Sequence, residues 1–232
     1  MSARISVIIP ALNEEQTIAE VVRGLRSPLI CECIVVDNGS TDRTAVEAAA
    51  AGARVIAEPR RGYGQACVTG ILAASPESDA FVFLDGDGSD ATAELSEIAG
   101  PVIEGRYDFV IGSRIRGQRE PGSLLASQIF AGQMAGLLIR LRYGVRYTDM
   151  GPFRAISRQA LEGLQMSEMS YGWNLEMQMK AARDGLRILE IPVNYRLRQG
   201  GVSKVAGSIR GSFKAASRIM KVFLAIGLGR AR

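Results

Sequence analysis

Short, almost wholly apolar runs alternate along the first half of the chain with longer segments in which apolar residues recur every three or four positions. Runs of the first kind are typical of strands buried on both faces, and segments of the second kind are typical of amphipathic helices. Their repeated succession favours a doubly wound, mainly parallel sheet flanked by helices. The predicted strands are residues 4–10, 31–37, 53–58, 79–85 and 107–114, and the predicted helices are residues 13–25, 40–53 and 62–74.

The second half of the chain is less regular. Gly151 and Pro152 interrupt it with a turn, and Pro192 marks the last apolar run as an edge strand because proline cannot donate to a sheet ladder. Gly185 is a typical helix C-terminus. The predictions are a helix at 123–143, a turn and short strand at 147–156, a helix at 174–185 and an edge strand at 186–198.

The end of the chain differs from the rest in charge. The whole sequence carries a formal net charge of +4, but after Glu190 there are nine Lys and Arg and no acidic residue. Such a tail favours an anionic partner: phosphate groups, anionic lipid or nucleic acid. Apolar residues at helical intervals over 205–227 predict a basic amphipathic helix. We therefore divide the chain into an α/β domain, 1–204, and a C-terminal helix, 205–232.

This C-terminal helix has two open interpretations. In the first, the helix lies at a membrane surface and gives peripheral attachment. In the second, it packs on its own protein, or on a second copy in a homodimer. The N-terminal sequence lacks a signal-peptide pattern, so a cytoplasmic location is expected, with the inner face of the membrane as the alternative.

Composition narrows the chemistry. Of 232 residues, 47% are hydrophobic and 22% charged, which suits one large domain with a substantial core. The three cysteines show no metal-site spacing and are interpreted as small buried residues. There is no histidine, which excludes Ser-His-Asp triads, Cys-His dyads and His-ligated zinc. Catalysis must use carboxylates, an oxygen-bound divalent metal, Lys or Arg, or backbone dipoles.

The acidic turn after the fourth predicted strand is the main candidate for chemistry. Asp85 and Asp87 follow an apolar run directly, on a turn opened by Gly86 and Gly88. Ligands of parallel sheets bind at the carboxyl ends of strands, where these side chains lie. Mg²⁺ or Mn²⁺ takes oxygen ligands and would relieve the repulsion between the carboxylates while bridging them to a diphosphate. The alternative is a solvated acidic turn.

Six segments in this order resemble the family 2 glycosyltransferases of the GT-A fold, and among them the dolichyl- or polyprenyl-phosphate sugar transferases. The segments are VIIPALNEEQTI, CIVVDNGSTDRT, RGYGQACVTGI, FVFLDGDGSD, VIGSR and TDMGPFRAI. The resemblance implies a mixed, mainly parallel sheet. It also implies inverting, metal-dependent transfer of a sugar from a nucleotide-diphosphate sugar, with UDP or GDP, to a polyprenyl or dolichyl phosphate.

The resemblance also implies a donor site. Asp85 and Asp87 match the D-x-D pair that binds the ribose side and the metal. Asn38 replaces a commoner aspartate, and Ser89 and Asp90 stand where relatives often place a metal-binding glutamine, which leaves the third protein ligand open. The implied nucleotide-sugar residues are Pro10, Leu12, Asn13, Glu14, Asp37, Gly64, Asp85, Gly86 and Lys204.

For the acceptor, the resemblance implies that Arg114 meets a phosphate, with Arg116 in the same basic cluster. Trp173 and Glu176 stand where relatives place acceptor-site residues. A lipid phosphate is already anionic near neutral pH and needs no general base. If the acceptor is a hydroxyl, a carboxylate base is necessary, and Asp149 and Glu176 are the candidates.

Each assignment has a structural alternative. In these alternatives, Glu176 is an ordinary helix-surface residue, Arg114 pairs with Glu120, and Lys204 belongs to a solvated loop. In the donor region, Asn13 and Glu14 cap a helix and Asp37 forms an Asx-turn.

Three competing functions also remain. The first is the same transfer to a soluble hydroxyl compound. The second is a non-catalytic nucleotide- or nucleic-acid-binding module, which the lack of a nucleic-acid motif disfavours. The third is a nucleotidyltransferase, whose Gly-rich phosphate loop is absent after the first strand.

Overall fold

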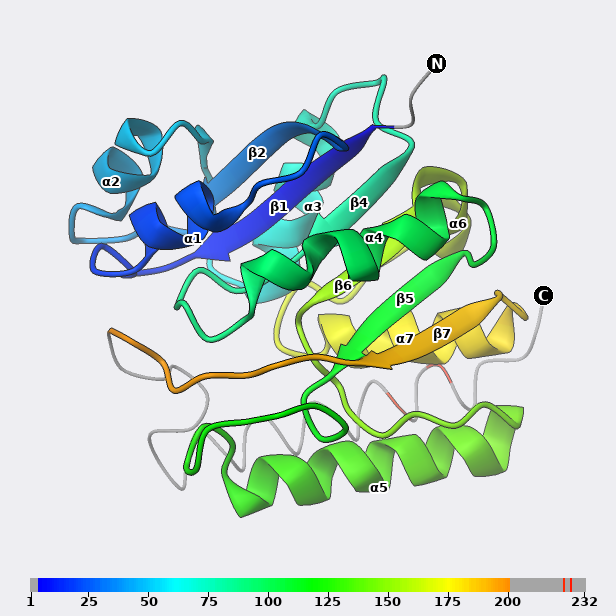
Figure 1. Cartoon of the computed structure of the whole chain (residues 1–232). Helices are drawn as coiled ribbons and strands as arrows, with labels where there is room; N and C mark the ends of the chain where they lie inside the picture. Colours follow the sequence, from blue (N-terminus) through cyan, green and yellow to red (C-terminus); the bar gives the residue numbers. More distant parts are fainter. Residues whose placement is uncertain (1–3, 201–222, 224–225, 227–232) are drawn as a thin grey trace.

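Apolar strands placed side by side form the centre of the molecule (Figure 1). The computed structural model describes residues 4–200 together with Phe223 and Ile226. Within them, seven strands form one sheet in the order β3-β2-β1-β4-β6-β5-β7. The strands are β1 (Ile5–Ala11), β2 (Ile30–Asp37), β3 (Arg54–Ala57), β4 (Ala80–Phe83), β5 (Phe109–Ser113), β6 (Arg154–Ser157) and β7 (Ile188–Pro192).

Parallel pairing dominates this sheet. Strand β1 pairs in parallel with β2 and β4, β2 with β3, and β5 with β7, whereas β6 runs antiparallel between β4 and β5. This confirms the predicted mixed, mainly parallel sheet. The last strand, β7, lies at an edge and ends at Pro192, as its proline predicts.

Helices cover both faces of the sheet. Most of them were predicted, but α4 and α6 were not. Helix α1 begins at Ile18 rather than at the expected residue 13, because the chain first makes a turn in which Asn13 has a φ of 54°. The helices are α1 (Ile18–Gly24), α2 (Thr44–Ala50), α3 (Tyr63–Ala73), α4 (Leu95–Ile103), α5 (Ala126–Tyr143), α6 (Arg158–Leu164) and α7 (Trp173–Arg183), with a 3₁₀ turn at Thr92–Glu94.

The core has two layers, one on each face of the sheet. Along β1, Ile8 faces one layer while Val7 and Ile9 face the other, as the two-residue period of a strand requires. The layer with Ile8 also contains side chains of α3, α5, α6 and α7, and the opposite layer contains side chains of α1, α2 and α4. Figure 1 shows α1 and α4 in front of the sheet, with α3 and α7 behind it. A strand buried on both faces explains the nearly continuous apolar runs of the sequence.

The predicted C-terminal helix, 205–227, and Lys204 lie outside the described residues, except for two side chains. Phe223 and Ile226 pack against the core layer that contains α5 and α7. In the described part of the chain, no helix is long and apolar enough to cross a membrane.

Candidate active site

The chain places polar residues at one edge of the sheet, where the parallel strands β1, β2, β4 and β5 end. Asn13 and Glu14 follow β1, Asp37 ends β2, Asp85 follows β4 and Arg114 follows β5. The carboxyl ends of parallel strands form the usual ligand-binding edge of such sheets. These five residues of the predicted donor and acceptor sites therefore occupy a common edge.

The loop that carries Asp85, Asp87 and Asp90, called the aspartate loop here, is held in place by its own carboxylates. Asp90 Oδ2 accepts a hydrogen bond of 3.0 Å from the backbone N–H of Asp85. Asp87 Oδ1 accepts one of 3.0 Å from the N–H of Ser89. The hydroxyl of Thr17, just before α1, donates to the Gly86 carbonyl at 2.8 Å. The loop is thus fixed in a conformation that keeps the three carboxylates close together.

These carboxylates are poorly compensated for their charge. Burial, and then the neighbouring Asp87 carboxylate, raise the pKa of Asp85 to about 7, although Arg114 and Arg198 act in the opposite direction. Burial, and then Asp85, also raise the pKa of Asp90. Within the described residues, the buried Oδ1 of Asp90 has no hydrogen-bond partner. The positive charge near the loop is therefore too small to balance its carboxylates.

This donor set fits a Mg²⁺ or Mn²⁺ ion only in part. Carboxylate oxygens suit these ions, which are usually held by one or two carboxylates plus substrate phosphates and water. No group of three or more His, Cys, Asp or Glu among the described residues is arranged to hold an ion by itself. Asp85 and Asp87 would hold the ion together with phosphates of a bound substrate, and the protein alone would not enclose it.

A cation that sequence reasoning missed reaches this loop. Arg198 Nη1 lies 3.1 Å from Glu14 Oε1, and its Nη2 lies 3.0 Å from Asp87 Oδ2. Burial alone would lower the pKa of Arg198. Asp87 and Glu14 together outweigh burial, so the pKa is raised. The sequence offered one signal, the alternation of Arg196 and Arg198 in an extended segment just before a Gly-Gly pair.

The loops after β1 and β2 are bonded to each other. Asp37 Oδ1 accepts from the N–H of Ser40 at 2.9 Å, which is the Asx-turn that the sequence offered as an alternative. Asn13 Oδ1 accepts from the N–H of Thr41 at 2.8 Å. The N-cap of α1 is Thr17, not Asn13 or Glu14. These bonds join the two loops into one surface at the strand ends, called the ledge here. The half-buried Pro10 and Leu12 also lie on it.

Two residues of the expected donor site have packing roles. The amide of Asn38 donates to the carbonyls of Glu58 and Arg60 and accepts from the N–H of Gly62, so it fastens the loop after β3. A Cβ at Gly64 would overlap the carbonyl oxygen of Glu168. Close contact with the 168–169 backbone is therefore one structural reason for this buried glycine, and its approach to a donor stays a prediction.

The expected acceptor arginine is locked in an ion pair. Arg114 Nε donates to Asp149 Oδ2 at 2.7 Å and Nη2 donates to Oδ1 at 2.9 Å, while the Arg114 N–H also donates to Oδ2 at 3.0 Å. Arg114 also lies 5.0 Å from the centre of the Tyr195 ring. Burial raises the pKa of Asp149, but its bonds to Arg114 outweigh that and the net shift is downward.

The suggested pairing of Arg114 with Glu120 is not what the structure shows. Glu120 instead accepts from the N–H of Leu197 at 2.7 Å. Arg116 is exposed, and its Nη1 donates to the Glu190 carbonyl at 2.7 Å.

Trp173 and Glu176, expected at the acceptor site, lie inside the molecule. Trp173 is fully buried. Its ring meets the Phe83 ring edge-on, with 6.4 Å between the ring centres. Glu176 is 2% exposed, accepts from the backbone N–H groups of residues 167 and 168, and pairs with Lys180 at 2.9 Å. The burial of Glu176 contradicts the alternative of an ordinary helix-surface residue, and both side chains are held inside the protein at the start of α7.

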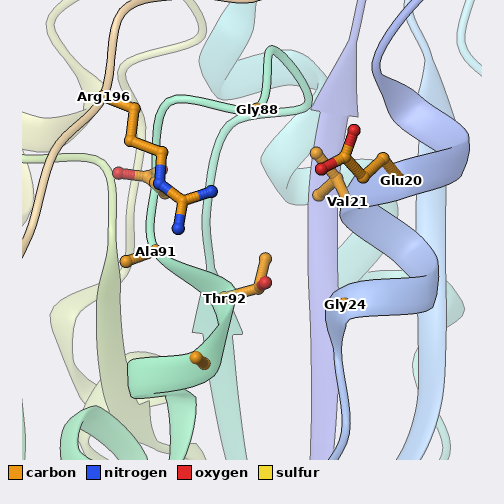
Figure 2. A pocket seen from close by; sticks show the side chains of 9 residues that line it. Glu20, Val21, Gly24, Gly88, Ala91, Thr92 and Arg196 are labelled. Atoms are coloured by element: carbon orange, nitrogen blue, oxygen red, sulfur yellow. The ribbon is translucent and has the colours of Figure 1, made fainter.

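A small pocket of about 110 Å³ lies next to the aspartate loop. Figure 2 shows Arg196 and Thr92 on one side of it and Glu20, Val21 and Gly24 of α1 on the other. Asp90 and Gly88 also line it, so the pocket borders the loop without containing Asp85 or Asp87.

Known proteins show the same sequence pattern. Residues 6–164 match the model of the family described as glycosyl transferase family 2. An uncharacterised glycosyltransferase of Mycobacterium tuberculosis is 36% identical over 220 residues, covering 94% of this chain and 97% of the relative. A polyprenol monophosphomannose synthase of Mycolicibacterium smegmatis is 29% identical over 226 residues, covering 88% of this chain and 82% of the relative.

Solved structures show the same fold. Glucosyl-3-phosphoglycerate synthase of Mycobacterium tuberculosis, in complex with Mn²⁺, UDP-glucose and phosphoglyceric acid, matches with a TM-score of 0.80 and 24% identity. The match covers 99% of this chain and 81% of that one. This likeness confirms the predicted GT-A type of sheet. Together with the family match over more than half of the sequence, it identifies the chain as a glycosyltransferase that belongs to glycosyl transferase family 2.

Proposed function

We propose that the protein transfers a sugar, with inversion, from a nucleotide-diphosphate sugar to a polyprenyl or dolichyl phosphate. The observation that carries this proposal is the aspartate loop at the carboxyl end of β4, where carboxylates of raised pKa gather without enough positive charge. Perturbed carboxylates at a sheet's ligand-binding edge are typical of functional sites. The polyprenol monophosphomannose synthase among the relatives supports the lipid acceptor.

On the donor side, the ledge formed by the loops after β1 and β2 would receive the nucleotide, with Asp37 and Asn13 at its surface. Asp85 and Asp87 would hold Mg²⁺ or Mn²⁺ against the diphosphate. A divalent ion bound there supplies Lewis-acid stabilisation of the departing nucleoside diphosphate. Lys204, proposed to close over the diphosphate, lies outside the described residues and stays a prediction.

On the acceptor side, Asp149 fixes the orientation of Arg114. The carboxylate takes Nε and Nη2, and within the described residues Nη1 makes no hydrogen bond. Nη1 is thus the group of this guanidinium that remains for an acceptor phosphate, with Arg116 nearby. Charge-assisted bonds from arginine are well suited to phosphate.

The state of the two expected bases favours a phosphate acceptor over a hydroxyl. Asp149 is bonded to Arg114, and Glu176 is buried beneath residues 167 and 168. Both carboxylates are thus already engaged by groups of the protein itself, which disfavours either as a general base, whereas an anionic phosphate oxygen needs no base. The absence of histidine then has no consequence for the chemistry.

The surface of α5 supports contact with a membrane. Helix α5 presents large apolar side chains to solvent, and residues 121–148 contain no acidic residue. Apolar side chains with basic neighbours suit the surface of an anionic bilayer. The exposed apolar residues include Phe130, Leu137 and Leu141, at 65%, 46% and 76%, and the basic neighbours include Arg140 and Arg142.

A transfer screen tests the proposal. Purified protein is incubated with UDP- and GDP-sugars and Mn²⁺ or Mg²⁺, with polyprenyl phosphate in one arm and soluble alcohols and phosphoglyceric acid in the other. We expect a glycosylated lipid phosphate that forms only with a divalent ion. Transfer to a soluble acceptor alone would replace the proposed acceptor, and transfer unaffected by EDTA would contradict the metal.

A further inference from the structure

The segment 193–200, called the strap here, is fastened to the aspartate loop. The N–H of Arg196 donates to the Ser89 carbonyl at 2.9 Å, and the N–H of Gln199 donates to the Asp87 carbonyl at 3.3 Å. Further back, the N–H of Tyr195 donates to the Gln118 carbonyl at 2.9 Å. The strap therefore holds its side chains at defined places over the strand ends.

Arg198 of the strap joins two strand ends that are far apart in the sequence. Its guanidinium lies between Glu14, which follows β1, and Asp87, which follows β4, with N–O distances of 3.1 Å and 3.0 Å. Both carboxylates are buried, with side-chain exposures of 6% and 7%. A removable positive charge thus stands beside the proposed metal ligands.

This ion pair competes with a metal at Asp87. Asp87 Oδ1 already accepts from the Ser89 N–H, and Oδ2 faces Arg198. A divalent ion that binds Oδ2 is opposed by the guanidinium in its present place, because two positive charges would then share one carboxylate oxygen. A displaced guanidinium beside a diphosphate would find a better partner there, because its planar set of donors matches phosphate oxygens bidentately.

We propose that Arg198 exchanges partners: it neutralises Glu14 and Asp87 when no donor is bound, and it moves onto the donor diphosphate when a divalent ion takes Asp87. The inference rests on the proposed function, because it requires the donor and metal at this site. Its consequence is thermodynamic coupling. The ion alone binds weakly because it must break an ion pair, whereas nucleoside diphosphate and ion bind together because the diphosphate receives the released guanidinium.

Replacing Arg198 separates this exchange from a simple structural role. Arg198→Gln removes the competitor and the phosphate ligand together. Mn²⁺ binding, followed by the electron paramagnetic resonance of free Mn²⁺, should become roughly tenfold tighter without nucleotide, since one charge-assisted bond no longer opposes it. Binding of UDP or GDP in saturating Mn²⁺ should become roughly tenfold weaker.

Arg196→Gln is the matched control, because it makes the same change of charge two residues earlier on the strap, where Arg196 lines the pocket in Figure 2. Both affinities should stay within about twofold of wild type, since exposed charges contribute little at a distance. Arg198→Lys keeps the charge but not the planar fork, so we expect its two affinities to lie between those of wild type and Arg198→Gln.

Opposite shifts of the two affinities support the exchange. A fall in both affinities would show that Arg198 only maintains the site, and unchanged Mn²⁺ binding in Arg198→Gln would show that it does not compete; either result overturns the inference while leaving the proposed function in place. If wild-type protein binds no Mn²⁺ even with UDP or GDP, the metal site itself fails and the inference fails with it.

Discussion

The aspartate loop after β4 and the Arg114–Asp149 pair after β5 lie at the same edge of the sheet, but their charges are balanced differently. Asp149 has its own guanidinium, bonds to it through both oxygens, and keeps a lowered pKa although it is buried. In the loop, burial and neighbouring carboxylates raise the pKa values of Asp85 and Asp90. Buried carboxylates are therefore not equivalent: one is fully paired and the others are not.

The difference in charge balance indicates which carboxylates support the fold and which are available to bind a ligand. A paired buried charge holds its neighbours in place, and removing one partner leaves the other uncompensated. Clustered carboxylates without enough cation store an unfavourable interaction that a bound ion can relieve. The Asp149 carboxylate should therefore contribute chiefly to stability, by holding Arg114 in place, and the aspartate loop should contribute chiefly to activity.

The largest effect should follow Asp87→Asn, which removes a proposed metal ligand with little change of shape. Transfer should fall by roughly a thousandfold or more, because a metal stabilising a leaving group contributes several kcal/mol. Initial rates at saturating Mn²⁺ measure this. Thermal unfolding serves as the control and should show a folded protein; a rate within about tenfold of wild type would remove Asp87 from the metal site.

Asp149→Ala should lower the free energy of unfolding by about 3–5 kcal/mol, because it leaves the buried Arg114 without a counter-charge. Urea unfolding measures the change. Glu104→Ala is the control, since the Glu104–Arg106 pair is 57% exposed on both sides and should contribute less than about 1 kcal/mol. Equal losses in the two variants would contradict the view that the inner pair is part of the framework.

Gly64→Ala tests the packing of α3 against residues 168 and 169. Its Cβ would overlap the Glu168 carbonyl, so the backbone must shift, at a cost of about 1–3 kcal/mol. Gly163→Ala in α6 is the control, because a Cβ there meets nothing within 4 Å and a helical alanine should stabilise by up to about 1 kcal/mol. A Gly64→Ala protein as stable as wild type would argue against this close contact.

The smallest effect should be a gain in stability that depends on pH. The folded pKa of Asp85, about 7, lies above its usual value, so the folded protein binds a proton between about pH 4 and 7 that the unfolded chain has released. Wild-type stability therefore falls as pH rises through this window. Asn cannot titrate, so Asp85→Asn should be more stable than wild type at pH 8. We expect a gain of about 1–2 kcal/mol, which is less than the full pKa shift would give, because Asp85 keeps some contact with solvent.

Urea unfolding of Asp85→Asn and wild type at pH 5 and pH 8 measures this difference. The advantage should shrink at the lower pH. An advantage of the same size at both values would show that it does not come from the titration of Asp85.

The sequence predicted the framework well because the framework depends on local patterns. Runs buried on both faces marked the parallel strands, and topology alone brought Asp37, Asp85 and Arg114 to one edge. Helix α4 escaped prediction since it carries Pro101 in its interior.

The partners within the site could not be predicted in the same way. Arg114 bonds to a residue 35 positions away, and Arg198 pairs with one 184 positions away. Such contacts depend on how irregular loops fold, which no periodic pattern encodes. Trp173 was misplaced for a related reason: an aromatic residue at the start of a helix has the same sequence signature in a core as in a binding site.

The most direct test of the metal site is anomalous diffraction from crystals soaked with Mn²⁺ and UDP or GDP. The account predicts a manganese peak in contact with the carboxylates of Asp85 and Asp87 and with the diphosphate, and Arg198 withdrawn from Asp87. Nucleotide bound at the strand ends with Arg198 still bridging Glu14 and Asp87, and no manganese between the aspartates, would contradict it.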